Sequence, residues 1–198
     1  AGGPYRIDTS LETKSTVPDL TWLYRGDCVL HLGVGNLFII AGQSNSAGYS
    51  RDFCIDPPSM DVHLYRNRNK WDIASHPMNE STFAGSLANE EMGVPGVSPY
   101  LAFGKTYGKM TGMPVGLIQT SLGGSPMERW NPKDGDLYLN MLDKIHQTGG
   151  KYAGVLWYQG CSDTNPGPAE KYLEHFREYV EATRKELGYE IPFFTMQL

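Results

Sequence analysis

The feature that most constrains the fold is the run of four large apolar side chains at residues 37–40, which Ala41, Gly42 and the polar residues 43–46 follow. Such a run, with β-branched and aromatic members, predicts a strand buried on both faces, as in a parallel sheet. Open α/β folds place their sites where such strands end and the chain turns into a helix. Ser44 is therefore a candidate nucleophile whose backbone N–H lies near a helix N-terminus. The alternative is a plain polar turn after a strand.

Further along the chain, apolar runs alternate with helical patterns. Strands are predicted at residues 62–65, 115–118, 154–158 and 191–198, and a long ordered loop at 69–95. Helices are predicted at 99–111, 137–148 and 168–187, each followed by a glycine. Their apolar faces contain Tyr100, Phe103, Tyr107 and Met110 in the first, Tyr138, Met141, Leu142 and Ile145 in the second, and Tyr172, Leu173, Phe176, Val180 and Leu187 in the third.

This alternation predicts an α/β fold, a three-layer α/β/α sandwich with a central parallel sheet, formed by residues 36–198. Residues 1–35 are predicted to be an N-terminal extension or hairpin. In it, residues 22–24 and 28–32 are expected to form two short strands around a turn at residues 25–27. The Gly-x-Gly at residues 33–35 precedes a strand instead of following it, which argues against a dinucleotide site.

Composition excludes several classes of function. The chain of 198 residues has a formal net charge of −5 and no basic block, which argues against nucleic acid as a partner. No apolar run approaches the ~20 residues of a membrane span. The chain begins at Ala1 without a methionine, so we expect a secreted or periplasmic protein that has lost a signal peptide, with a cytoplasmic location left open.

The three cysteines, Cys28, Cys54 and Cys161, have no metal-binding spacing. A disulfide between Cys28 and Cys54 is one possibility, because these two flank the first core strand. Free, buried thiols are the alternative that we favour slightly. We predict no metal and no cofactor.

Three polar segments follow predicted strands: residues 42–45 (GQSN), 121–130 (SLGGSPMERW) and 156–163 (LWYQGCSD). Together they resemble the SGNH-type carbohydrate esterases, the group that includes sialate O-acetylesterases and acetylxylan esterases. The resemblance extends from about Asn36 to Leu198. It implies the flavodoxin-like SGNH fold, an acetylated carbohydrate as substrate, and a serine esterase without a cofactor.

The resemblance also implies a role for particular residues. Ser44 is expected to be the nucleophile, and the oxyanion hole is expected to use the backbone N–H groups of Ser44 and Gly124 and the side-chain amide of Gln159. We expect Gln43, Asn45, Gly123 and Trp130 to contact the substrate, with Trp130 as an aromatic wall for a sugar ring. A plain turn at Gly123 and a capped strand end at Gln159 are the structural alternatives.

The general base is the main departure from the family pattern. Relatives of this kind have an Asp-x-x-His segment after the last strand, and Leu198 precedes that point, so we expect the chain to be C-terminally incomplete, with the missing segment supplying Asp and His. The match at residues 143–146 lies inside a predicted helix, where a solvated helix face is expected. Of the other histidines, only His76 in the long loop is placed to approach the site, although solvation is its expected state. Cys161 stands where many relatives have Glu.

A serine without a base is a weak nucleophile. The leading hypothesis is therefore a carbohydrate O-acetylesterase that acts through an acyl-enzyme and needs a base from elsewhere. The alternative is a catalytically inactive carbohydrate-binding domain that retains the pocket. A third possibility, a general lipase-like esterase, is disfavoured by the polar, aromatic-rich loops.

Overall fold

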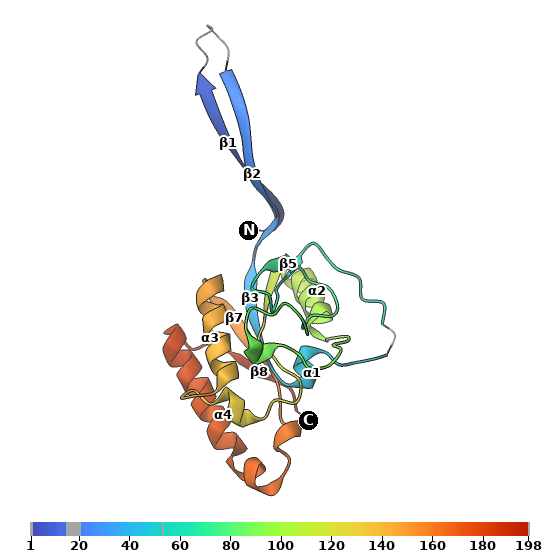
Figure 1. The fold of residues 1–198 in the computed structure, drawn as a ribbon, viewed down its shortest axis with the longest axis vertical. Coiled ribbons are helices and arrows are strands. Elements are labelled where there is room, and N and C mark those ends of the chain that lie inside the picture. Colours follow the sequence, from blue (N-terminus) through green and yellow to red (C-terminus); the bar gives the residue numbers. More distant parts are fainter. Residues whose placement is uncertain (1, 15–20, 53, 198) are drawn as a thin grey trace.

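The computed structural model describes residues 2–14, 21–52 and 54–197 (Figure 1). A two-stranded sheet contains β1 (Gly2–Lys14) and β2 (Thr21–Val34). A six-stranded sheet contains β3 (Asn36–Gly42), β4 (Val62–Tyr65), β5 (Trp71–Ile73), β6 (Val115–Gln119), β7 (Tyr152–Tyr158) and β8 (Phe193–Thr195). The helices are α1 (Ser44–Ala47), α2 (Tyr100–Thr111), α3 (Asp136–Thr148) and α4 (Pro166–Leu187), with short 3₁₀ turns at Leu87–Asn89, Met127–Trp130 and Cys161–Asp163.

The strands of the six-stranded sheet lie in the order β5-β4-β6-β3-β7-β8. Every neighbouring pair is parallel except β4 and β5 at one edge. The first core strand, β3, lies in the interior of the sheet between β6 and β7, which explains its continuous apolar run. The predicted α/β fold class with a central parallel sheet is confirmed.

Alternate side chains of β3 enter two separate cores, one on each face of the sheet. Phe38 and Ile40 pack with Tyr100 and Leu101 of α2. Ile39 and Ala41 pack on the opposite face with residues of α3 and α4, among them Met141 and Tyr179. The sheet is therefore the middle of three layers, as predicted.

Some element boundaries and faces differ from the predictions. Of the strand predicted at residues 191–198, only Phe193–Thr195 form β8 within the described residues 191–197, and Leu198 lies outside the described part of the chain. Strand β5 lies within the predicted loop. Pro99 caps helix α2 instead of beginning it. Met110 and Leu173, placed on apolar helix faces, are 82% and 57% exposed. Apart from Leu173, which lies at an exposed position within α4, these differences lie at the ends or edges of elements, where few neighbouring side chains cover the chain.

The N-terminal strands pair differently from the prediction. Residues 25–27 form no turn but lie inside β2, and Ser10 of β1 pairs with Arg25. The connection between the two strands falls at residues 15–20, outside the described part of the chain. Figure 1 shows the pair projecting away from the six-stranded sheet, in line with β3.

The cysteine predictions were partly wrong. All three cysteines are free, so Cys28 and Cys54 form no disulfide. The thiols are exposed and not buried, because Cys28 lies on the projecting β2, Cys54 on a loop and Cys161 at the start of a short 3₁₀ turn.

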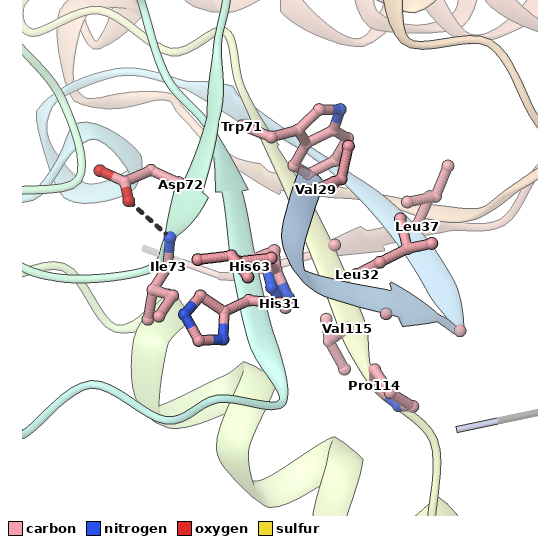
Figure 2. A pocket seen from close by; sticks show the side chains of 14 residues that line it. Val29, His31, Leu32, Leu37, His63, Trp71, Asp72, Ile73, Pro114 and Val115 are labelled. Carbon is pink, nitrogen blue, oxygen red and sulfur yellow. Dashed lines mark hydrogen bonds between the residues drawn. The ribbon is translucent and has the colours of Figure 1, made fainter. Parts of the chain in front are cut away.

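A cavity of about 450 Å³ lies at the base of the projecting strands, between β2 and the amino-terminal parts of β3 and β6 (Figure 2). Val29, Leu37, Trp71 and His63 are among its lining residues, and burial lowers the pKa of His63. The three signature loops, which contain residues 42–45, 121–130 and 156–163, follow the opposite, carboxyl ends of the parallel strands, so this cavity lies away from Ser44. Within the described residues, no helix is both long enough and apolar enough to cross a bilayer.

Candidate active site

The three signature loops leave the carboxyl ends of three adjacent strands, β6, β3 and β7, and hydrogen bonds join them. The Gly42 carbonyl accepts from the backbone N–H of Leu122 at 3.1 Å and from the Ser125 hydroxyl at 3.3 Å. On the other side, the Gln43 N–H donates to the Tyr158 carbonyl at 3.1 Å. The loop that carries Ser44 is therefore held between the other two.

Gly42 shows how tightly this junction is packed. Its φ is +123°, and a Cβ there would lie 2.5 Å from the Tyr158 carbonyl oxygen. Only glycine fits both the backbone conformation and the space. The glycine that ends the apolar run is thus required because the neighbouring strand β7 leaves no room for a side chain at position 42.

Ser44 is the first residue of α1 and is partly exposed. Its hydroxyl makes no hydrogen bond to any other residue in the described ranges. The nearby Ser46 is fully buried, and its hydroxyl donates to the Ala41 carbonyl at 2.8 Å and lies 3.0 Å from the Tyr100 hydroxyl. Of these two serines, Ser44 is therefore the one that an ester can reach.

Gln43 is placed beside Ser44, but its side chain points into the protein. It is 3% exposed, and its side-chain oxygen accepts from the backbone N–H groups of Gly160 at 3.0 Å and Ser162 at 3.1 Å. The predicted substrate contact is replaced by a structural one, because this oxygen satisfies backbone donors of the β7 loop. Asn45 remains partly exposed, with its amide 3.9 Å from the Cys161 sulfur.

The Gly123–Gly124 loop presents one backbone donor to solvent. Gly124 is exposed with φ +69°, and a Cβ there would meet nothing within 4 Å. Its N–H has no acceptor among the described residues. The Gly123 N–H, in contrast, donates to Glu91 Oε1 at 2.7 Å. The predicted preference for Gly124 as an oxyanion donor fits this arrangement.

Gln159 is buried, with 4% of its surface exposed, and its amide is engaged within the protein. Its Nε2 donates to the Ser125 carbonyl at 3.1 Å and to the Asp163 carboxylate, which also accepts the Met127 N–H at 3.0 Å. Both amide hydrogens are used in these contacts, so this arrangement leaves none for an oxyanion. Gln159 joins the β6 and β7 loops instead.

The prediction that Trp130 forms a wall for a sugar ring is wrong. Trp130 is fully buried, with its ring centroid 5.1 Å from that of Trp157 and 5.8 Å from that of Tyr179. Its indole N–H donates to the Ser125 hydroxyl at 3.4 Å. The large aromatic ring fills the core between the sheet and α4, where it gains more from burial than at the surface.

The histidines with described contacts bond to groups other than Ser44. His76 Nε2 lies 2.9 Å from Asp56, and its Nδ1 accepts the Ser98 N–H at 3.3 Å, so it is neither solvated nor at the nucleophile. Burial would raise the pKa of Asp56, but the hydrogen bonds and charges of Lys105 and His76 hold it below its ordinary value.

The Asp143 to His146 match lies on the exposed face of α3, as predicted. His146 pairs with Glu186 at 3.1 Å, and Asp143 accepts from the Gln147 amide at 2.6 Å. Across residues 2–14, 21–52 and 54–197, no cluster of three or more His, Cys, Asp or Glu side chains is arranged to hold a metal ion.

A hollow of about 440 Å³ adjoins the site on the side of α4 and β8. Gln159 and Gly160 form one end of it, Tyr172 and Phe176 form its aromatic side, and Met196 lies where β8 ends. Because Ser44 is not among the lining residues, this hollow extends the site laterally and is not the space directly over the nucleophile.

Sequence reasoning missed the group that holds the Gly123 loop. Glu91 lies in the long loop at 69–95, where no periodic pattern indicates which side chains turn inward. The only local indication that Glu91 could have a structural role was a carboxylate in a segment rich in glycine and proline, and exposed loops often contain such a carboxylate.

Comparisons with known proteins place the chain among carbohydrate esterases. The family model described as "carbohydrate esterase, sialic acid-specific acetylesterase" matches residues 34–198. A probable carbohydrate esterase of Arabidopsis thaliana is 25% identical over 174 residues, which cover 77% of this chain and 64% of that protein. The chain thus spans less than two thirds of that relative's length.

Solved structures support the fold. A protein of Arabidopsis thaliana gives a TM-score of 0.71 at 23% identity, covering 81% of this chain and 73% of that one. A carbohydrate acetylesterase from Xanthomonas citri gives 0.60 at 21% identity, covering 100% and 46%, and NanS gives 0.64 at 17% identity, covering 81% and 66%. At these identities the likeness concerns the fold alone.

Proposed function

Because the chain belongs to the carbohydrate esterase family of sialic acid-specific acetylesterases, we propose that it is a carbohydrate O-acetylesterase that removes acetyl groups from sugar hydroxyls. The observation that carries the proposal is the junction of three strand-end loops around a partly exposed Ser44. This junction combines a reachable hydroxyl with an uncommitted backbone donor on the adjacent loop.

In the proposed mechanism, the Ser44 hydroxyl oxygen attacks the acetyl carbonyl carbon and transfers its proton to a general base. The carbonyl oxygen becomes an oxyanion that accepts hydrogen bonds from the N–H groups of Ser44 and Gly124. Collapse of this tetrahedral intermediate releases the sugar, whose oxygen takes the proton, and leaves acetyl-Ser44. Water then attacks the acetyl-enzyme and releases acetate. Two backbone donors held in place stabilise the developing charge without reorganisation.

We propose that an Asp-x-x-His segment supplies the general base of this mechanism. His76 and His146 are bound to Asp56 and Glu186, and neither contacts Ser44 in the described structure. An Asp-x-x-His segment that followed β8 would leave the sheet at the same carboxyl edge as the three loops. We therefore propose that such a base is required for attack on sugar esters, whereas the activated ester p-nitrophenyl acetate, whose leaving group needs no proton, acylates Ser44 at a lower rate without it.

The family description suggests O-acetylated sialic acid as the substrate to test first. Acetylated xylan and p-nitrophenyl esters of longer acyl chains provide the comparison. Preferential release of acetate from the sialic acid ester would support a sialate esterase, equal release from xylan would support a broader carbohydrate esterase, and a preference for long acyl chains would contradict both.

The decisive experiment compares hydrolysis of p-nitrophenyl acetate by the wild-type chain, by S44A and by S50A. Ser50 is exposed and lies on the same loop, so S50A is a matched control. The proposal predicts that S44A abolishes hydrolysis, whereas S50A retains it. Mass spectrometry of the quenched reaction should show one acetyl group on the peptide that contains Ser44. Hydrolysis by S44A at the wild-type rate would refute the role of Ser44.

A further inference from the structure

We infer that Glu91 is a positioning residue. It holds the loop with Gly123 and Gly124 in a fixed position relative to the segment that carries Ser44. The catalytic role of Glu91 rests on the proposed function, whereas its role in holding the two loops together does not. Glu91 lies in the loop between β5 and α2, and none of the three signature segments contains it. One carboxylate there contacts both loops that provide the proposed oxyanion donors.

The two oxygens of this carboxylate bind different loops. Oε1 accepts the Gly123 N–H at 2.7 Å, and Oε2 accepts the Tyr49 hydroxyl at 2.5 Å. Tyr49 lies two residues after the helix α1 that begins at Ser44, next to its C-cap Gly48. Burial, and then the hydrogen bond to Glu91, raise the pKa of Tyr49 to about 12, so its hydroxyl remains a donor at neutral pH.

The environment of Glu91 is unusual for a carboxylate. It is 3% exposed, and none of the described cations forms an ion pair with it. A buried charge without a counter-ion is expensive unless several donors compensate for it. A third donor, the Asn79 amide, also binds Oε1, so three hydrogen bonds take the place of a cation.

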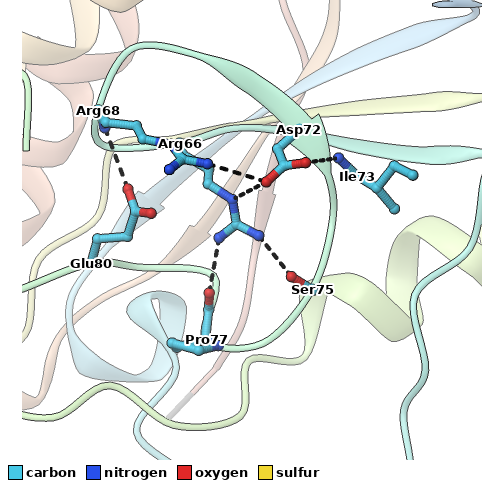
Figure 3. A network of polar contacts seen from close by, with 7 residues as sticks. All are labelled: Arg66, Arg68, Asp72, Ile73, Ser75, Pro77 and Glu80. Carbon is cyan, nitrogen blue, oxygen red and sulfur yellow. Dashed lines mark hydrogen bonds and ion pairs between the residues drawn. The ribbon is translucent and has the colours of Figure 1, made fainter. Parts of the chain in front are cut away.

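Asn79 is itself fixed from several sides. Its amide also donates to the Ser121 carbonyl at 3.2 Å, and its oxygen accepts from Asn67, which donates to the Asn89 carbonyl at 2.8 Å. The loop that leads to Asn79 is anchored by Arg66, which bonds Asp72 at 3.2 Å, Ser75 at 2.7 Å and the Pro77 carbonyl at 3.1 Å (Figure 3). The carboxylate therefore sits on a rigid support.

The consequence for catalysis follows from peptide geometry. The bond to Glu91 fixes the Gly123 amide and consumes it, which leaves the Gly124 N–H as the free donor of this loop. A side chain on Gly123 would lie 2.9 Å from both Glu91 and Tyr49, so the loop is packed directly against the pair. Without the carboxylate, the Gly123 N–H would lose its acceptor, and the loop, with the adjacent Gly124 N–H, would be free to change its conformation.

The test uses the variants E91A, E91D, E91Q and, as a matched control, E90Q. E91A removes the acceptor, and E91D withdraws the carboxylate from Gly123 by one methylene. E91Q keeps an oxygen that can accept from Gly123 and Asn79, while its NH₂ can donate to Tyr49. Glu90 is the adjacent glutamate, has no side-chain hydrogen bond among the described residues, and should behave as wild type.

Two readouts separate positioning from a general loss of structure. For p-nitrophenyl acetate, kcat should fall about 10- to 100-fold in E91A and E91D at nearly unchanged KM, because removal of an oxyanion donor lowers rates by ~10²–10³. E91Q should recover most of the rate. Hydrogen–deuterium exchange of the peptide with residues 122–125 should accelerate in E91A and E91D and remain slow in E91Q and E90Q.

The outcomes are distinguishable. Wild-type rates in E91A and E91D together with unchanged exchange at Gly123 would overturn the inference, and E91D keeps the test open should E91A not fold. Faster exchange in E91D, with a wild-type chain that hydrolyses no acetyl ester, would support the loop-holding role and count against the proposed function alone. Loss of activity in E91Q equal to that in E91A, without faster exchange, would also overturn it.

Discussion

Gln43 and Gly160 lie at the ends of the neighbouring strands β3 and β7, and the Gln43 side-chain oxygen accepts the Gly160 backbone N–H at 3.0 Å. The two residues are 117 positions apart in the sequence. Gln43, which precedes the proposed nucleophile Ser44, thus binds the loop after β7, and that loop in turn fixes the orientation of the Gln43 side chain.

Replacement of Gln43 by leucine should destabilise the protein and lower its activity. The N–H groups of Gly160 and Ser162 would lose their acceptor, at a cost of about 1–3 kcal/mol for an unsatisfied buried donor. Q43E keeps the acceptor oxygen, so its urea midpoint should stay near that of wild type. Its added negative charge next to the oxyanion should still reduce kcat. Equal stability of Q43L and wild type would contradict the fastening role.

Gly124 and Gly112 provide a matched pair for alanine substitution. Their φ values are +69° and +68°, and a Cβ on either would meet nothing within 4 Å. Each substitution should therefore cost about 1–2 kcal/mol of backbone strain and no more. Gly112 ends α2. We expect G124A to lower kcat for p-nitrophenyl acetate and G112A to leave it unchanged. Equal kcat in both variants would remove Gly124 from the oxyanion site.

Lys144 should make stability rise with pH. It is fully buried, its ammonium donates to the Gln119 carbonyl at 2.8 Å, and burial lowers its pKa from 10.5 to about 7. Between pH 7 and 10.5 the unfolded chain therefore binds more protons than the folded one, so the free energy of unfolding increases with pH. In K144M this increment should be absent.

The measurement for Lys144 is a series of urea unfolding curves from pH 7 to 9.5. The exposed Lys109, on α2, gives the control K109M, which should keep the wild-type slope. The same slope in K144M and K109M would show that Lys144 does not titrate in this range.

Trp130 should matter for stability and not for substrate affinity. W130F leaves a void between Trp157 and Tyr179 and should lower the free energy of unfolding by about 1–3 kcal/mol, less than the 3–5 kcal/mol typical of truncation to alanine. KM for an acetylated sugar should not change. W71A removes a ring that is 43% exposed and should cost less than truncation of the fully buried Trp130 to alanine. A raised KM in W130F without loss of stability would restore the sugar-wall interpretation.

Much of the architecture could be predicted because it depends on local patterns. The apolar run of residues 37–40 became β3, the predicted strand at residues 62–65 became β4, and the helices predicted at 99–111, 137–148 and 168–187 each lie within two residues of α2, α3 and α4. These elements bury continuous stripes, and periodicity alone reveals such stripes. The register of β1 with β2 could not be predicted in this way, because both strands are mostly exposed and irregularities shift their pairing at three places.

The sequence by itself determined how the core strands and the three long helices succeed one another along the chain, and where polar segments follow three of the strands. Apolar periodicity and glycine breaks, which are local properties of the chain, suffice for this. Only the tertiary structure decided which polar side chains face solvent. Gln43, Gln159 and Trp130 turn inward because donors and acceptors from remote segments meet them there. Glu91 supports the Gly123 loop for the same reason. A side chain's direction is set by the partners that folding brings to it, and no pattern of neighbouring residues encodes those partners.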